Sequence, residues 1–463
     1  MNGLLNWVDA RFPLTKVWNE HLAEYYAPKN FNFFYFFGSL ALLVLVLQIV
    51  TGIFLTMHYK PDAAMAFASV EYIMRDVPGG WFIRYMHSTG ASMFFIVVYL
   101  HMFRGLIYGS FKGPRELVWL IGMLIYLALM AEAFMGYLLP WGQMSFWGAQ
   151  VIINLFNTIP FIGDVVSTTI RGDFVISDPT LNRFFAFHVV AVPLILVGLV
   201  FVHIVALHAV GSNNPDGVEI KKLKDERGIP LDGIPFHPYY SVKDIVGVVV
   251  FLIVFFFIVF FMPEGGGYFI EHANFEPANA LKTPEHIAPV WYFTPFYTVL
   301  RAVPDPWYGT LAMFAAIAVL FVLPWLDKNP IKSVRYRNKA HLINLAWFSV
   351  TFIVLGMLGV MAVTDGLKEL GTRGTQIYFL FFAVTYAHSR PQQTNYLAWF
   401  IGLLVVVLFW DFLRHDTSFT DIQSSLFWQM MLLPIAYLAT TLLLPHFVSG
   451  ANKEKEVPTR VTG

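Results

Sequence analysis

The feature that most constrains this chain is a series of apolar segments, each long enough to cross a hydrocarbon core about 30 Å thick. Only 13% of the 463 residues are charged and 57% are hydrophobic, whereas soluble domains are about 25% charged. Core helices of soluble proteins are also shorter than these segments. We therefore expect an all-α integral membrane protein with about ten transmembrane helices. The expected helices cover residues 32–56, 78–108, 117–138, 183–209, 244–262, 307–326, 342–363, 375–388, 396–413 and 425–446.

Basic residues are distributed unevenly between the loops. Twelve lie in 109–116, 210–243 and 327–341, and five lie in 57–77, 139–182 and 263–306. Because basic loops stay in the cytoplasm, we expect the first set and the N-terminus on that side. Ten crossings place the C-terminal tail there as well. The helix 375–388 is short for a span, and without it the tail would lie outside.

Two of the weakly basic loops are too apolar to be plain connections. Residues 146–156 have the amphipathic pattern of a helix that lies along the outer membrane surface. The loop 263–306 is rich in proline and aromatic residues, and we expect both loops to fold back over the helices. The chain has no cysteine and therefore supplies no disulfide or iron–sulfur ligand. Its net charge of zero gives no indication of nucleic-acid binding, and residues 1–30 show no cleavable signal peptide.

The helix 78–108 contains two histidines, His87 and His101, fourteen residues apart. Fourteen residues make almost four helical turns, so both side chains point the same way, roughly 21 Å apart along the axis. One imidazole therefore lies toward each side of the membrane. Two imidazoles buried in lipid need partners.

The helix 183–209 repeats this pattern with His188 and His203, which are fifteen residues apart. The extra residue turns the second side chain slightly off the face of the first. Pro193 lies between them and can kink the helix, which would absorb the difference.

Because the two helices run in the same direction, His87 lies level with His188 near the outer side, and His101 lies level with His203 near the inner side. Facing pairs at two depths indicate two bis-histidine haem sites stacked across the bilayer. The alternative is that each imidazole bonds to a backbone carbonyl or lines an aqueous path. Zinc fits less well, because each depth offers two imidazoles and no cysteine.

Glycines recur with the same fourteen-residue period in the neighbouring helices, at Gly38, Gly52, Gly122 and Gly136. A missing side chain at each depth lets a flat porphyrin approach the backbone, although small-residue helix packing is an alternative. Arg84 and Arg104 flank the first histidine pair near the two membrane surfaces. They are placed to bind haem propionates, or else they are interfacial arginines whose heads reach toward water.

With these features the chain resembles cytochrome b, the dihaem subunit of respiratory bc complexes, over about residues 30–345. The resemblance is carried by the stretches 84–104, 136–148, 183–188, 211–215, 236–244 and 283–292. It implies two low-spin haems b and a Q-cycle that oxidises ubiquinol at an outer site and reduces quinone at an inner site. The implied partners are a Rieske iron–sulfur protein, a cytochrome c-type subunit and a second copy of the complex. The implied location is the bacterial inner membrane.

The resemblance also assigns residues to the sites. The outer quinone site receives Tyr137, Gly142, Pro289, Trp291, Tyr292 and Tyr297, and the inner site receives His208, Ser212, Lys243 and Asp244. Trp119 is assigned to the haem environment. Lys243 and Asp244 would protonate reduced quinone, since groups of different pKa at one surface suit proton transfer. Without the resemblance they are an ordinary pair at a helix N-terminus.

Three departures from the family pattern matter. The family's outer loop usually carries a glutamate that is a proposed proton acceptor, and this chain has Val290 there. We expect Glu285, five residues earlier, to replace it, unless it is a solvated loop carboxylate. The fifteen-residue histidine spacing occurs in chloroplast-type relatives, which split the protein after the fourth helix, whereas this chain continues. Beyond about residue 345 the resemblance fades, and helices beyond the family's usual eight are expected.

We therefore expect three regions: a dihaem four-helix bundle with its external loop (1–215), quinone-site loops and helices (216–345), and further helices with a cytoplasmic tail (346–463). Two other classes of protein remain open. A dihaem anchor of a dehydrogenase would lack the outer loop that ends at Tyr292. A haem-free transporter would use the intramembrane histidines without iron.

Overall fold

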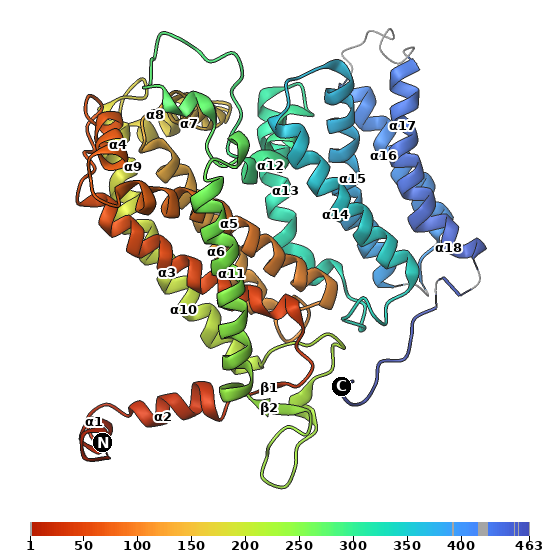
Figure 1. The fold of residues 1–463 in the computed structure, drawn as a ribbon. Helices are drawn as coiled ribbons and strands as arrows, with labels where there is room; N and C mark the ends of the chain where they lie inside the picture. The colour runs from red at the N-terminus through yellow and green to blue at the C-terminus, as the bar shows by residue number, and fades with distance from the viewer. Residues whose placement is uncertain (1, 391–392, 415–424, 449, 452, 463) are drawn as a thin grey trace.

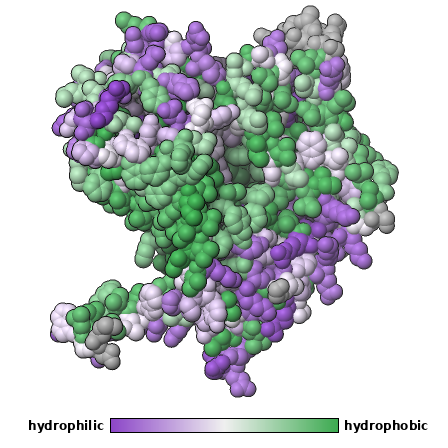
Figure 2. Space-filling model, viewed as in Figure 1, coloured by the Kyte–Doolittle hydropathy of each residue, from purple (hydrophilic) through white to green (hydrophobic). Residues whose placement is uncertain are grey.

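The computed structural model describes residues 2–390, 393–414, 425–448, 450–451 and 453–462. The described chain is a bundle of long helices with one small two-stranded sheet (Figure 1). The polar N-terminal segment forms two short helices, α1 (Asn2–Asp9) and α2 (Leu14–Trp18), which project from one end of the bundle (Figure 1). Figure 2 shows apolar side chains over the middle of the bundle and hydrophilic side chains at its ends. This is the surface of a helical membrane protein, as predicted.

Four spans form the N-terminal half. They are α3 (Phe36–Thr56), α5 (Gly80–Tyr108), α6 (Glu116–Leu138), and one long helix built from α9 (Asp178–Ala186), the turn η3 (Phe187–Ala191) and α10 (Val192–Val210). The short helix α4 (Ala66–Arg75) connects α3 with α5. Helix α3 packs against α5, and α6 packs against α10. The first four predicted helices are therefore confirmed.

The turn η3 is π-helical, and it carries His188. A π turn holds one residue more than an α turn. It therefore brings a separation of fifteen residues close to the geometry that fourteen residues have in an α-helix. Pro193, which we expected to absorb the difference by a kink, lies just after this turn in the first turn of α10 and has no N–H to offer the preceding carbonyls. The extra residue is thus accommodated in η3, next to the proline.

Six helices form the C-terminal half. They are α11 (Ser241–Phe261), α13 (Pro306–Leu326), α14 (Lys339–Val360), α15 (Asp365–Ser389), α16 (Tyr396–Arg414) and α17 (Ser425–Leu438), the last of which continues through η9 (Ala439–Leu443) into the short α18 (Leu444–Phe447). Within the described residues, nine helices are long and apolar enough to span a membrane. Helix α15 is a tenth long helix outside that group.

Helix α15 is longer than the predicted segment 375–388, because it begins at Asp365. Its first half is polar, which interrupts the apolar pattern on which the prediction depended. Arg373 in that half is fully buried and pairs with Asp411 of α16 at 2.5 Å and with Glu369. The charge is thus neutralised inside the protein, where a lipid-facing guanidinium would be costly. At about 1.5 Å per residue the observed helix is long enough to cross a bilayer.

The two apolar loops cover one end of the bundle, here called the α7 end. Residues 146–156 lie within α7 (Gln143–Asn157), as predicted, and α8 (Gly163–Arg171) follows. The loop after α11 contains η7 (His272–Phe275), η8 (Trp291–Phe293) and α12 (Thr294–Arg301). The Gln143 side chain donates to the Lys282 carbonyl at 3.0 Å and accepts from the Asn279 N–H at 2.7 Å, which ties the two loops together. Both loops fold back over the helices, which confirms that prediction.

The opposite end, here called the strand end, holds the only sheet of the described chain. Strand β1 (Tyr26–Pro28) pairs antiparallel with β2 (Gly233–Pro235), with Tyr26 opposite Pro235. Asp232, beside β2, binds Lys29 at 3.3 Å and Arg460 of the C-terminal tail at 2.7 Å. Both ends of the chain therefore lie at this end of the bundle (Figure 1), as an even number of crossings requires.

Candidate functional site

The four predicted histidines form two facing pairs between α5 and the η3–α10 helix. The ring centroids of His87 and His188 are 6.1 Å apart with an interplanar angle of 90°, and those of His101 and His203 are 6.4 Å apart with an angle of 63°. Each separation equals two metal–imidazole bonds of about 2.0 Å plus the two ring radii. One metal ion fits between the rings of each pair. The arrangement expected for bis-histidine haem sites is therefore present at both depths.

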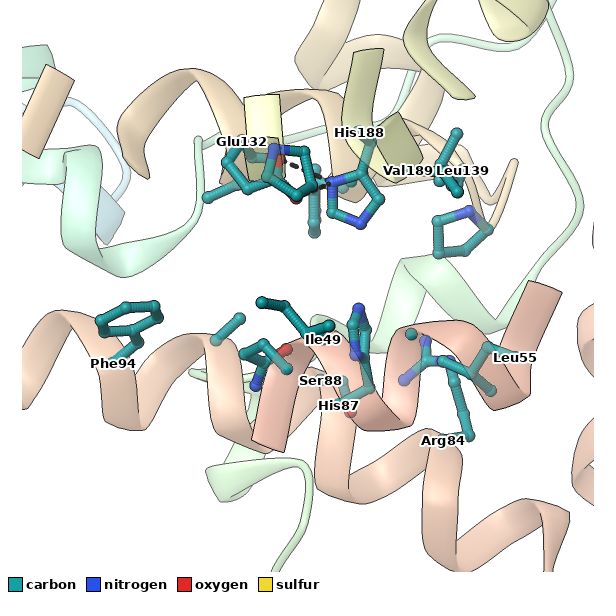
Figure 3. Close-up of a pocket in the computed structure, with 18 of the residues that line it drawn as sticks. Ile49, Leu55, Arg84, His87, Ser88, Phe94, Glu132, Leu139, His188 and Val189 are labelled. Atoms are coloured by element: carbon teal, nitrogen blue, oxygen red, sulfur yellow. Dashed lines mark hydrogen bonds and ion pairs between the residues drawn. The ribbon is translucent and has the colours of Figure 1, made fainter. Parts of the chain in front are cut away.

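The two pairs differ in what holds their outer nitrogens. Nδ1 of His87 lies 2.9 Å from the Thr51 hydroxyl, and Nδ1 of His188 lies 3.0 Å from both the carbonyl oxygen and Oε1 of Glu132 (Figure 3). Nδ1 of His101 is buried without a hydrogen-bond partner among the described residues, and Nδ1 of His203 has no side-chain partner there. Hydrogen bonds at this nitrogen fix the orientation and raise the basicity of a metal-binding imidazole.

Sequence reasoning missed Glu132, although the sequence contained a signal. It is an acidic residue in the interior of the apolar helix α6, four residues before Gly136. An ionisable side chain inside a membrane segment is by default a candidate for function. Its second carboxyl oxygen, Oε2, is buried without a partner among the described residues, which leaves one acceptor open toward the site.

The predicted glycines lie directly against the histidine rings. A Cβ at Gly38, Gly52 and Gly122 would lie 3.3, 3.2 and 3.2 Å from Cε1 of His101, His87 and His203. A Cβ at Gly136 would lie only 2.4 Å from Cε1 of His188. The glycines therefore let the imidazole of one helix lie against the backbone of the next, and the space that we expected for a porphyrin is in the first place space for the imidazole rings.

Arg84 and Arg104 are buried on α5 beside the two histidine pairs. Nη1 of Arg84 and Nε of Arg104 have no hydrogen-bond partner among the described residues. Arg104 also lies over the ring of Tyr35, 5.0 Å from its centroid. Buried guanidinium groups with open donors suit an anionic ligand. Trp119 packs against Gly105 and donates to the Leu320 carbonyl at 2.8 Å, so it fixes α6 against α5 and α13.

A cavity of about 530 Å³ extends from the outer histidine pair toward the α7 end. Arg84, His87 and Ser88 line it from α5, and Glu132 and His188 face them from α6 and η3 (Figure 3). Most of the remaining lining is aliphatic or aromatic. A few polar groups that converge in an apolar cavity are typical of a site for a cofactor or an organic substrate.

The predicted outer-site residues lie around the α7 end of this cavity. Among the described residues, Tyr137 and Tyr292 belong to its lining, whereas Gly142, Pro289, Trp291 and Tyr297 do not. Tyr292 stacks on Phe95 with centroids 3.9 Å apart. Two of the remaining four contact the lining: the Trp291 indole donates to Ser92 at 3.0 Å, and Gly142 abuts Asn274. Pro289 directly precedes Val290 of the lining, and Tyr297 lies under Arg301, outside it.

The predicted carboxylate Glu285 is exposed and does not belong to the cavity lining within the described chain. A different acidic residue, Glu271, lies at the cavity edge and was missed. Its Oε2 accepts a hydrogen bond of 2.5 Å from the Tyr137 hydroxyl. Burial raises the pKa of Glu271 to about 7, although the hydrogen bond from Tyr137 acts in the opposite direction. Val290 is itself buried in the lining.

The predicted inner-site residues lie at the strand end in two small groups. The His208 ring stacks on Tyr25 with centroids 4.4 Å apart, and the Tyr25 hydroxyl lies 3.1 Å from Oγ of Ser212. Asp244 accepts a hydrogen bond from the Ser39 hydroxyl at 2.7 Å, and Lys243 lies over the ring of Tyr240. Contacts between Tyr25 and Phe236, and between Phe236 and Tyr240, join the two groups.

The fold and the paired histidines define a helical membrane protein with two facing imidazole pairs between its spans. Residues 22–211 match the family model described as cytochrome b/b6/petB, and residues 277–379 match cytochrome b(C-terminal)/b6/petD. Cytochrome b of Allochromatium vinosum is 61% identical over 400 residues, which cover 84% of this chain and 96% of that protein. Cytochrome b of Rhodospirillum rubrum is 51% identical over 384 residues, which cover 83% and 92%.

A chain of a solved hyperthermophilic respiratory complex III is 40% identical, with a TM-score of 0.77, and the match covers 82% of this chain and 98% of that chain. This chain therefore belongs to the cytochrome b family, as a cytochrome b subunit of a bc complex and a component of an oxidoreductase. The C-terminal match reaches residue 379, so the family likeness extends beyond the predicted limit of about 345. Helices α16 and α17 lie after the matched region.

Proposed function

We propose that this chain binds two low-spin haems b, one between His87 and His188 and one between His101 and His203. The observation that carries the proposal is the presence of two facing imidazole pairs with nearly equal centroid separations, 6.1 and 6.4 Å. When bound, the haems supply one-electron transfer across the membrane.

The other residues of the two sites hold and orient these groups. Arg84 and Arg104 offer buried, open N–H donors, and they bind the propionates. Thr51 and Glu132 orient the outer imidazoles through Nδ1. Gly136 keeps the space that the His188 ring occupies.

We further propose that ubiquinol is oxidised in the cavity beside the outer pair, where Tyr137 and Tyr292 line the α7 end. Quinone is reduced at the strand end, where His208 and Asp244 bind it and supply protons from the cytoplasm. One electron of each quinol crosses the membrane through this chain. The other goes to a Rieske iron–sulfur protein and then to a cytochrome c-type subunit. The reaction is quinol–cytochrome c reduction by a Q-cycle.

The proposed setting is the inner membrane of a bacterium, in a homodimeric complex, with the strand end and the N-terminus in the cytoplasm. The basic loops 109–116, 210–243 and 327–341 support this orientation, because they gather at the strand end. There Arg115 and Lys332 share the carboxylate of Glu219.

An optical redox titration of the purified complex tests the haem proposal. We expect two low-spin b-type components with different midpoint potentials, and we expect His203→Leu to remove one of them while the other remains. The absence of haem would refute the proposal and favour a transporter. Two haems without quinol–cytochrome c reductase turnover would favour the anchor of a dehydrogenase.

A further inference from the structure

Oxidation of a quinol releases two protons, and the cavity needs a group that accepts one. Val290 is buried in the cavity lining and cannot accept a proton. Glu132 also lines the cavity and its Oε2 is open, but its Oε1 lies 3.0 Å from Nδ1 of His188, so a proton on this carboxylate would disturb the imidazole that it orients. Glu285 is exposed and is absent from the lining within the described chain.

Glu271 is held at the edge of the same cavity by the residues on either side of it. Ile270 is buried in the lining, and Asn274, also in the lining, accepts a hydrogen bond of 2.9 Å from the backbone N–H of Ser145 in α7. The Glu271 carboxylate then accepts the Tyr137 hydroxyl at 2.5 Å, and Tyr137 itself lines the cavity. One hydrogen bond therefore joins the cavity to a carboxylate.

Glu271 also has an open side. Its side chain is only partly buried, in a loop at the α7 end. A proton taken from the cavity can therefore leave toward solvent on that side without crossing the apolar core. A proton acceptor here needs a link to the cavity and a side that is open to solvent. Glu285 has only the solvent contact, and Glu132 lies inside α6, so among these three carboxylates Glu271 alone has both.

We propose that Glu271 is the proton acceptor for quinol oxidised in this cavity and replaces the carboxylate that Val290 lacks. The inference rests on the function proposed above. In the step, a quinol O–H bond breaks and a Glu271 O–H bond forms, either directly or through Tyr137, which passes its proton on as it receives one. The two electrons leave one at a time, to the iron–sulfur partner and to the outer haem. The second proton leaves on the side of the iron–sulfur partner, and quinone remains.

The groups that face Glu271 set the pH range of the effect. They are the hydroxyls of Tyr137 from α6 and of Tyr292 from η8, and the neighbouring His272 lies on the exposed side. Burial raises the pKa of Glu271 to about 7. The carboxylate is therefore ionised and able to accept a proton above about pH 7, and it is protonated below that pH, so the rate should rise with pH through this value.

The test measures steady-state quinol–cytochrome c turnover of the intact complex, from two pH units below to two above that pKa. Glu271→Gln should slow turnover about 100-fold at high pH and remove the rise through pH 7. Glu276→Gln is the matched control: it changes an exposed carboxylate five residues later in the same loop and should keep the native rate and profile. Val290→Glu in the Glu271→Gln background should restore part of the rate.

The proposal is overturned by a native rate and pH profile in Glu271→Gln, or by a loss that is equal at every pH and is not rescued by Val290→Glu. A loss confined to Glu285→Gln would also overturn it. The optical redox titration of each variant separates this inference from the function on which it rests. Two intact haems with unchanged kinetics refute Glu271 alone, whereas absent haems in the native complex refute the proposed function.

Discussion

Replacement of Gly136 by alanine should selectively weaken the outer haem site. The added Cβ would lie 2.4 Å from Cε1, 2.8 Å from Nδ1 and 3.0 Å from Nε2 of His188. Ordinary contact begins at 3.4 Å, so the ring must move by about 1 Å, and overpacking of this kind costs about 1–3 kcal/mol. The ring has little freedom to move, because its Nδ1 lies 3.0 Å from both the carbonyl and the carboxylate of Glu132.

At 1.4 kcal/mol per factor of ten, this cost corresponds to a loss of roughly 10- to 100-fold in haem affinity at the outer site. Haem content per chain and the optical redox titration measure the effect. We expect Gly136→Ala to lose one of the two components.

Gly122→Ala is the matched control, because it changes the glycine fourteen residues earlier on the same helix. Its Cβ would lie 3.2 Å from Cε1 of His203, a contact that a shift of a few tenths of an ångström relieves. The control should retain both haems. Retention of both components in Gly136→Ala, or equal losses in the two variants, would refute the reasoning from ring contacts.

Two further substitutions test the surroundings of the sites. Glu132→Gln should raise the midpoint potential of the outer haem by about 60 mV, because it weakens a hydrogen bond worth about 1.5 kcal/mol to the axial imidazole; potentiometric titration measures the shift. Glu219→Gln should lower the unfolding free energy by about 3 kcal/mol, since it leaves Arg115 and Lys332 without their shared carboxylate, and thermal unfolding in detergent measures it. Burial alone would raise the pKa of Glu219, but the hydrogen bonds and charges of Arg115 and Lys332 lower it to about 2. The native stabilisation should therefore persist above about pH 4.5 and decline as the pH falls toward 2.

Each of these two predictions would be contradicted by a different result. An unchanged outer potential in Glu132→Gln means that the carbonyl of residue 132 alone holds Nδ1 of His188. A Glu219→Gln variant that unfolds like the native protein means that the two cations are satisfied by solvent.

Helical periodicity made the histidine pairs predictable. His87 and His101 lie on one α-helix, so their spacing alone fixes their relative direction. The spacing of His188 and His203 did not fix theirs, because the π turn in η3 depends on local backbone geometry beside Pro193. The correct pairing followed because fifteen residues end about 60° from a whole number of turns, which keeps both side chains roughly on one face.

The two carboxylates at the cavity were harder to predict, for different physical reasons. Glu132 had a visible signal, as an acidic residue inside an apolar span. Its partner His188, however, lies on another helix, so helical periodicity does not connect the two residues. Glu271 had no comparable signal, because it meets Tyr137 only after the loop following α11 folds over the end of α6. The two residues are 134 positions apart, and their contact depends on tertiary structure, which periodicity does not describe. Glu285 was expected at the site because it is close to Val290 in the sequence, but its side chain is exposed to solvent.

The different partners of the two histidine pairs predict a direction for electron transfer between the two proposed haems. At the outer pair, Nδ1 of each imidazole has an oxygen partner, from Thr51 and from Glu132, and such partners stabilise the more positive, oxidised metal. At the inner pair, neither Nδ1 has a side-chain partner among the described residues. The outer haem should therefore have the lower potential, and electrons should move from the α7 end to the strand end. The same asymmetry predicts that Glu132→Gln narrows the gap between the two potentials.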